Sequence, residues 1–285
     1  MKLNPFIGLK QIKEEEYCHS NSFDLYQRVD ELAPSYQEGQ TRDMFLFLFF
    51  INILTKNKID FLVKGGIILN MFLGEHARRS EDLDVYVKDP DIFFKEVNNI
   101  LLKEYDGLSF KPVWVKKRFA DKNYYRNTFA FDINVYHHDE FIKTFTIDGV
   151  FSEDYEKMEK VKYLGPKIID DDFYFYGVDL EYIASEKILS DTSELRRPVK
   201  HLIDLYSLIN LDLDVDKIKK YVFKSLKEEN EVREKLNIPL ITNKLVISEN
   251  KEFGDSYFFT AIDAGYTLSK KEMIAAINDW LNINI

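Results

Sequence analysis

One short stretch, from Phe61 to Lys88, constrains this chain more than any other part of its 285 residues. It contains a Gly-Gly pair at Gly65 and Gly66, then an apolar segment, then Asp82-Leu83-Asp84. Glycines permit a tight turn and let the backbone approach a ligand closely. A helix that starts after such a turn directs its amides and positive dipole end at that ligand, which suits phosphate. The stretch therefore predicts a phosphate-binding turn followed by an acidic strand.

The residues after Glu81 alternate between polar and apolar side chains, which is typical of a half-buried strand. Asp82 and Asp84 are two positions apart, so their side chains share a face and can hold one pair of metal ions. The segment Thr128–Tyr136 alternates in the same way and places Asp132 on its polar face. Asp132 can thus supply a third carboxylate to the same cluster.

Carboxylates that lie close together need a compensating charge. Two of them about 4 Å apart repel by roughly 4 kcal/mol at an effective dielectric near 20. No lysine alternates with the aspartates until Lys88. Oxygen ligands attract divalent cations, and Mg²⁺ is the usual one where phosphates complete its shell. Each element alone has a plainer explanation, a turn or an exposed strand, but their joint order favours a Mg²⁺ site.

The rest of the chain indicates an α/β front part, residues 1–177, and a mainly helical rear part, residues 178–285. Thr41 or Asp43 is a candidate cap for a helix through Leu54, and a polar turn around Asp121–Asn123 predicts a hairpin. Ser269 or Thr267 can cap the last helix. The other expected helices are Ile67–Leu73, Asp91–Lys103, Leu180–Ser190, 198–209 and 214–235, and the expected strands are Phe61–Val63, Leu83–Val87, Pro112–Arg118 and Thr128–Tyr136.

Composition narrows the class of protein. A net charge of −10 argues against broad binding of duplex nucleic acid but leaves room for a small basic pocket. The basic clusters Arg78–Arg79, Lys116–Arg118 and Arg196–Lys200 are more often solvated faces than binding sites. The longest apolar run, Met44–Leu54, is shorter than the about 20 residues that cross a bilayer. With a single cysteine and no signal-peptide pattern, we expect a cytoplasmic protein without a membrane anchor.

The glycine turn and the aspartates carry a resemblance to a known family. The segments Leu62–Gly66 and Arg79–Val85, with Gly74 between them, resemble the signature of the AbiEii/AbiGii nucleotidyltransferase toxins, members of the polymerase-β-like nucleotidyltransferase superfamily. Leu180–Lys187 resembles the family's lysine-bearing helix, and Arg196–Tyr206 resembles its later basic and Asp-Leu-Tyr motif. The resemblance implies an α+β fold, in which helices flank a mixed sheet and a helical C-terminal part packs against it.

The resemblance also implies an activity. Such an enzyme moves a nucleoside monophosphate from a nucleoside triphosphate (NTP) to an acceptor hydroxyl and releases pyrophosphate. It implies a toxin of a bacterial toxin–antitoxin or phage-defence system, with a cognate antitoxin as partner and RNA, such as tRNA, as acceptor. The alternative enzyme on the same chemistry is a nucleotidyltransferase that acts on a small molecule or a protein. Asp82 and Asp84 would hold Mg²⁺, and Asp132 would hold the second metal and help to deprotonate the acceptor. The nucleotide-binding residues would be Lys64, Gly65, Gly66, Arg79, Ser80, Lys187 and Lys200.

The chain departs from the superfamily pattern at one point. Many members place Ser after the first glycine and Thr next, where this chain has Gly66 and Ile67. A side-chain hydroxyl contact to phosphate is therefore missing, although the backbone amides remain. This departure keeps a second class open, a catalytically degenerate module that binds a nucleotide or a partner in the same cleft.

Overall fold

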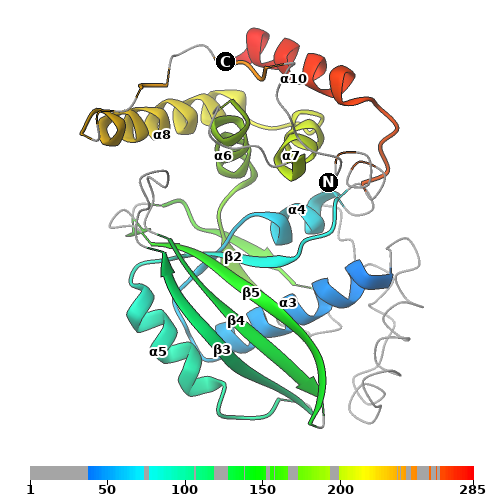
Figure 1. Cartoon of the computed structure of the whole chain (residues 1–285), viewed down its shortest axis with the longest axis vertical. Coiled ribbons are helices and arrows are strands. Elements are labelled where there is room, and N and C mark those ends of the chain that lie inside the picture. Colours follow the sequence, from blue (N-terminus) through cyan, green and yellow to red (C-terminus); the bar gives the residue numbers. More distant parts are fainter. Residues whose placement is uncertain are drawn as a thin grey trace. The chain divides into compact units, whose positions relative to one another are not determined.

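Within the described residues, seven strands form one mixed sheet in the order β3-β4-β5-β2-β1-β7-β6 (Figure 1). β2 pairs antiparallel with β1 and parallel with β5, whereas β4 pairs antiparallel with both β3 and β5. The mixed sheet with its helices confirms the expected α+β class. The strands are β1 (Leu62–Val63), β2 (Asp82–Val87), β3 (Leu108–Arg118), β4 (Thr128–His137), β5 (Glu140–Phe151), β6 (Val161–Leu164) and β7 (Tyr174–Gly177).

The structure is a computed structural model, and its chain divides into two units. The first holds the sheet with helices α3 (Glu38–Lys56), α4 (Gly66–Leu73) and α5 (Pro90–Ile100). The second holds the later helices together with Arg78 and Arg79. The described residues are 38–73, 77–105, 107–118, 128–137, 139–151, 155–156, 158–165, 173–192, 199–235, 237, 239–241, 245–248, 257, 261 and 264–285.

Alternation along the strands gives the sheet two unlike faces. On β2, Leu83, Val85 and Val87 are buried on one face, the apolar face, while Asp82 and Asp84 lie half-buried on the other, the polar face. Residues paired directly opposite each other share a face, so the registers carry this division to the neighbouring strands. The apolar face continues through Phe145 and Ile147 of β5 and Phe129, Phe131, Ile133 and Val135 of β4.

Aromatic side chains of two helices cover the apolar face. The rings of Phe47 and Phe50 in α3 lie 5.3 and 5.4 Å from the ring of Phe145, both edge-on. Phe93 of α5 lies 5.9 Å from Phe129, and all of these rings are buried. Aromatic pairs at such distances add to the free energy gained from burial. Because these side chains cover the apolar face, a site for a ligand can be built on the opposite, polar face.

The second unit consists of α6 (Leu180–Thr192), α7 (Val199–Ile209), α8 (Val215–Lys235) and α10 (Lys270–Asn284). Asp179 caps α6, since its carboxylate accepts from the amide of Tyr182 at 2.6 Å. The same carboxylate accepts from the hydroxyl of Tyr221 at 2.9 Å, which ties α8 to the start of α6. Ser269 and Glu272 form the reciprocal cap of α10. These caps explain why the helices begin where they do.

Most of the expected elements are confirmed, with shifts of a few residues at their ends. The helix through Leu54 is the exception at its start, because it begins at Glu38 and not at a cap formed by Thr41 or Asp43. Asp43 lies inside that helix, where its buried carboxylate pairs with Lys143 of β5. The turn at Asp121–Asn123 lies outside the described residues. None of the described helices combines the length and the apolar composition needed to cross a membrane.

Candidate active site

The Gly65 turn brings the start of α4 against the acidic strand. The amide of Lys64 donates to the carbonyl of Asp84 at 3.0 Å, so the chain leaves β1 beside that aspartate. Gly65 has φ +68°, a conformation that side-chain-bearing residues rarely adopt. A Cβ at this position would stand 2.2 Å from Oδ2 of Asp84. Glycine is required on both counts, and the Asp84 carboxylate lies directly against the turn that opens α4.

The first turn of α4 has the properties of a phosphate-binding helix start. The helix runs for eight residues from Gly66, and both Gly66 and Ile67 are buried. The first amides of a helix have no partner within it, and they carry the positive end of its dipole. Ile67 contributes no hydroxyl, so any hold on phosphate here comes from backbone amides.

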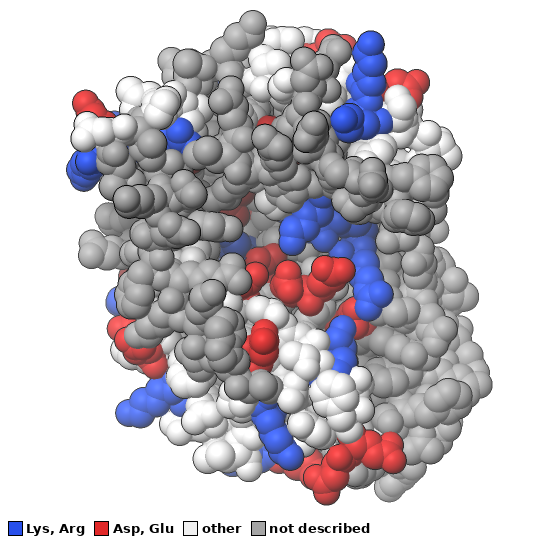
Figure 2. Space-filling model, in the orientation of Figure 1, with Lys and Arg blue, Asp and Glu red and all other residues white. Residues whose placement is uncertain are grey.

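The carboxylates of the polar face stand in two rows across β2, β5 and β4. In the first row, Asp82 pairs with Thr146, and Thr146 pairs with Asp132. In the second row, Asp84 pairs with Asp148. Adjacent strands are about 4.8 Å apart, so Asp148 is the immediate neighbour of Asp84. Acidic side chains gather over this part of the sheet in the view of Figure 2.

The structure places the predicted third carboxylate, Asp132, on the same face but at a distance. It lies two strands from Asp82, which corresponds to about 10 Å between backbones. Thr146 stands between them and donates from Oγ1 to Oδ1 of Asp132 at 2.7 Å. The predicted trio therefore shares a surface, with Asp132 as its outlying member.

Asp148 is the acidic residue that sequence reasoning missed. The segment around it, Thr144–Gly149, alternates as a strand does, with Thr146 and Asp148 on one side. That pattern alone did not relate it to Asp82 and Asp84, because it lies more than sixty residues further along the chain. The parallel pairing of β2 with β5 is what puts Asp148 in register with Asp84.

The donor set of this face suits a hard cation. Its acidic members offer only oxygen atoms, the ligands that Mg²⁺ prefers. Among the described residues, no group of three or more His, Cys, Asp or Glu side chains is spaced to hold a metal ion. Mg²⁺ often relies on one or two carboxylates, with substrate phosphates and waters completing its shell. Asp82 and Asp84 fit that kind of site, in which the nucleotide brings part of the coordination.

The remaining predicted residues near β2 have distinct surroundings. Ser80 is buried, and its hydroxyl donates to the carbonyl of Asp82 at 3.3 Å, so it shapes the entry to the strand. Lys64 is half-buried, and its ammonium lies 5.2 Å from the ring centre of Tyr86. Arg79 is exposed. Their predicted contacts with a nucleotide remain predictions.

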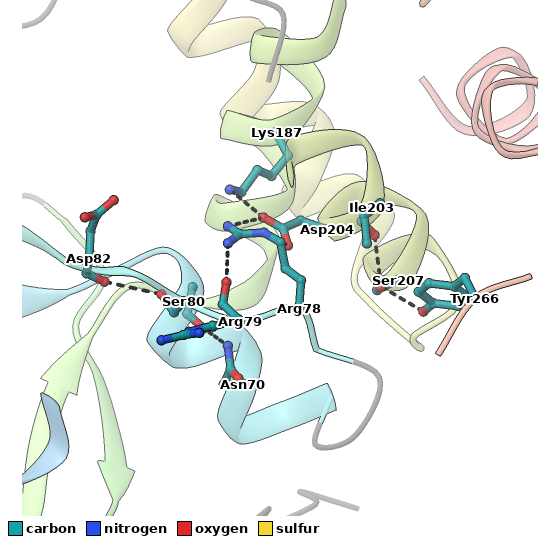
Figure 3. A network of polar contacts seen from close by, with 11 residues as sticks. Asn70, Arg78, Arg79, Ser80, Asp82, Lys187, Ile203, Asp204, Ser207 and Tyr266 are labelled. Atoms are coloured by element: carbon teal, nitrogen blue, oxygen red, sulfur yellow. Dashed lines mark hydrogen bonds and ion pairs between the residues drawn. The ribbon is translucent and has the colours of Figure 1, made fainter. Parts of the chain in front are cut away.

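The second unit contains a buried ion cluster formed by Arg78, Lys187 and Asp204 (Figure 3). The guanidinium of Arg78 forms a two-pronged pair with Asp204, with both N–O distances 3.0 Å. The ammonium of Lys187 lies 2.8 Å from Oδ2 of Asp204, whose side chain is 3% exposed. Residues 126 positions apart in the chain are thereby joined.

Electrostatics keep Asp204 ionised. Burial disfavours its charged form, but the positive charges of Arg78 and Lys187 outweigh that effect, and the pKa of Asp204 is lowered from its ordinary value. Arg78 also donates to the carbonyl of Arg79 at 2.8 Å, which shapes the chain just before Ser80. Sequence reasoning named Lys187 but assigned no site role to Arg78 or Asp204. Lys200 lies one turn before Asp204 on α7 and is exposed.

Comparisons with known proteins identify the family and the fold of the chain. The sequence model of the nucleotidyl transferase AbiEii toxin family, a type IV toxin–antitoxin system, matches residues 49–281. Among solved structures, the chain is similar to MenT4, a nucleotidyltransferase toxin from Mycobacterium tuberculosis H37Rv, with 16% identity and a TM-score of 0.62 over 92% of this chain and 88% of that one. This likeness establishes the fold.

A weaker likeness is to JHP933 from Helicobacter pylori, with 14% identity and a TM-score of 0.45 over 87% of this chain and 95% of that one. Among curated proteins, none matches the chain significantly.

Proposed function

The chain belongs to the AbiEii nucleotidyltransferase toxin family, and on that premise we propose that it transfers a nucleoside monophosphate from an NTP to an acceptor hydroxyl, with release of pyrophosphate. One observation carries the proposal. The carboxylate of Asp84 lies against the Gly65 turn, where α4 begins, and shares its face with Asp82 and Asp148. A helix start for phosphate and carboxylates for a cation thus lie side by side.

In this proposal the chain positions the NTP by two kinds of contact. The backbone amides at Gly65 and Gly66 donate hydrogen bonds to phosphate oxygens, and the positive end of the α4 dipole attracts the phosphate charge. Asp82 and Asp84 hold Mg²⁺, which when bound polarises the phosphoryl oxygens and neutralises their charge. Lys64 and Ser80 of the first unit are assigned to the triphosphate. The other sequence-based candidates, Arg79, Lys187 and Lys200, belong to the second unit, where Lys187 pairs with Asp204.

The reaction needs a base near the acceptor. The acceptor oxygen bonds to the α-phosphorus, the bond from that phosphorus to the pyrophosphate oxygen breaks, and the hydroxyl proton passes to a carboxylate. Asp148 is the best placed carboxylate for that proton, because it neighbours Asp84 directly. Asp132, our sequence-based candidate, lies one strand further away.

The family also bears on partners and location. A toxin of this family implies a cognate antitoxin, and we propose that the chain acts in the cytoplasm of a bacterium with such a toxin–antitoxin or phage-defence system. The acceptor in this proposal is RNA, with tRNA among the candidates, and a protein acceptor is the alternative. The chain has a second possible role as a degenerate binding module, which Gly66 and Ile67 favour because neither offers the phosphate a hydroxyl.

Label transfer separates the enzyme from the binding module. The protein is incubated with each NTP labelled at the α-phosphate, with Mg²⁺ and with total RNA or total protein. We expect label on one acceptor class and an equal yield of pyrophosphate. Asp84→Asn should abolish transfer, while Asp212→Asn, a matched change at an exposed aspartate of the second unit, should not. Binding of NTP without transfer to any acceptor would favour the degenerate module.

A further inference from the structure

The polar face of the sheet does not end at the carboxylates. It continues along β4 and β5 toward the end at which His137 pairs with Glu140, and it includes the neighbouring part of β3. Asn134 pairs with Thr144 of β5 and with Lys111 of β3, and Tyr136 pairs with Phe141. A register shift between Val135 and Tyr136 keeps the two aromatic side chains on this face. We call this set, Lys111, Asn134, Tyr136, Phe141 and Thr144, the hairpin platform.

Side chains of the hairpin platform hold one another in place. The hydroxyl of Thr144 donates to Oδ1 of Asn134 at 2.5 Å, and Nδ2 of Asn134 lies 3.5 Å from the Tyr136 hydroxyl. The ammonium of Lys111 lies 4.4 Å from the ring centre of Tyr136, within reach of a cation–π contact. The ring of Phe141 meets that of Tyr136 edge-on at 5.7 Å. The platform is therefore ordered before any ligand arrives.

The hairpin platform is nevertheless open to solvent. Phe141 is 58% exposed, and Lys111 and Thr144 are exposed as well. Lysine on an edge strand has a plain explanation, since it discourages pairing with another sheet. The exposed ring of Phe141 lies edge-on to that of Tyr136, so the two rings present one aromatic surface. Exposed aromatic side chains next to a cation are typical of surfaces on which nucleobases stack.

Net charge narrows the kind of nucleic acid that can bind here. In a chain with a net charge of −10, a short single strand held beside a local cation such as Lys111 is better suited than a duplex that covers a broad surface.

We propose that the hairpin platform binds the acceptor as a single-stranded nucleic acid, with bases stacked on Phe141 and Tyr136 and a phosphate at Lys111. The inference rests on the proposed function, because it places the acceptor hydroxyl toward the rows that contain Asp132 and Asp148. Tyr136 is four residues from Asp132 along β4, about 13 Å at the rise of a strand. A strand stacked on the platform can therefore present its end to the carboxylates.

Fluorescence anisotropy with the full chain tests the surface. The probes are a short labelled single-stranded RNA of mixed sequence and the DNA of the same sequence. Phe141→Ser removes the ring on which one base would stack, so it should weaken RNA binding about tenfold. Phe141→Trp keeps a ring there and should retain the affinity of the wild type. Lys111→Gln should lower the slope of log Kd against log salt concentration by about 0.7, and Lys111→Arg should restore it. Preference for RNA over DNA would indicate contacts with the 2′-hydroxyl.

Matched controls come from exposed residues away from the platform. Phe223→Ser removes a 45% exposed ring of α8, and Lys95→Gln removes an exposed charge of α5. Neither should change the affinity for RNA. Equal losses in platform and control variants would overturn the proposal, and so would a wild-type chain that binds neither probe.

Two further readouts keep this proposal apart from the proposed function. A fluorescent NTP analogue should bind the platform variants as tightly as it binds the wild type, and Asp84→Asn should lose it. If label from NTP appears on protein while RNA stays unlabelled, the platform proposal fails and the transferase proposal stands. If the wild type binds the RNA but not the NTP, the transferase proposal fails.

Discussion

Asp84 and Gly65 lie so close that the carboxylate of one occupies the space where a side chain on the other would begin. Oδ2 of Asp84 is 2.2 Å from the position of a Cβ on Gly65, whose φ is +68°. The amide of the preceding Lys64 donates to the carbonyl of the same aspartate. The turn proposed to bind phosphate and the carboxylate proposed to hold a cation are thus in direct contact, and a change in either should disturb both.

A comparison of Gly65→Ala with Gly107→Ala should separate the effect of backbone strain on stability from the loss of NTP binding. The left-handed backbone alone costs an alanine about 1–2 kcal/mol of stability. Gly107→Ala is the matched control, because Gly107 has φ +77° and lies outside the site. Urea unfolding should show losses in both variants, whereas NTP binding should fail only in Gly65→Ala, since Asp84 must move there. Equal NTP binding in the two variants would contradict this account of the turn.

Asp148→Asn should impair transfer more than Asp132→Asn. Loss of the catalytic base lowers the rate of proton transfer by about 10²- to 10⁴-fold. Asp148 adjoins Asp84, while Asp132 lies beyond Thr146. The measurement is the initial rate of label transfer at saturating NTP, with Asp212→Asn as the control. The reverse order of the two defects would restore Asp132 as the third carboxylate.

Asp204→Asn should destabilise the second unit in a pH-dependent way. It leaves Arg78 and Lys187 as buried cations without their counter-charge, a change that costs about 3–5 kcal/mol. Because the pKa of Asp204 is lowered in the folded chain, its contribution is present above the unfolded value and is lost as pH falls through the folded one. Urea midpoints of wild type and variant should therefore differ fully at neutral pH and converge below about pH 4. A difference that does not change with pH would argue against this ion cluster.

Chelation should affect the nucleotide complex and not the free protein. Mg²⁺ with a non-hydrolysable NTP at 100-fold its Kd should add about 2.7 kcal/mol of stability, which raises Tm by several degrees. EDTA should remove that rise yet leave the Tm of the free chain unchanged, because Asp82 and Asp84 need phosphate to complete the shell. Asp84→Asn should show no rise in the presence of Mg²⁺. A rise that survives EDTA would mean that phosphate binds without a divalent metal.

Sequence alone determined the local features of this protein. The alternation around Asp82 and Asp84 predicted their shared face, and the Gly65-Gly66 pair predicted the turn before a helix. Caps such as Ser269 marked the starts of helices. These features follow from backbone geometry over a few neighbouring residues, which is why a linear pattern reveals them. The motif that resembles the AbiEii family lies in the same stretch. The match of the family model to residues 49–281 confirms that the chain belongs to this family.

Tertiary structure decided which distant residues meet. The parallel pairing of β2 with β5 brings Asp148 beside Asp84 and leaves Asp132 one strand further out. The ion pair of Arg78 with Asp204 joins residues that no periodicity relates. The register shift after Val135 places Tyr136 beside Phe141. Strand order and register depend on the packing of the whole apolar face, a sum of long-range contacts that short sequence patterns do not encode.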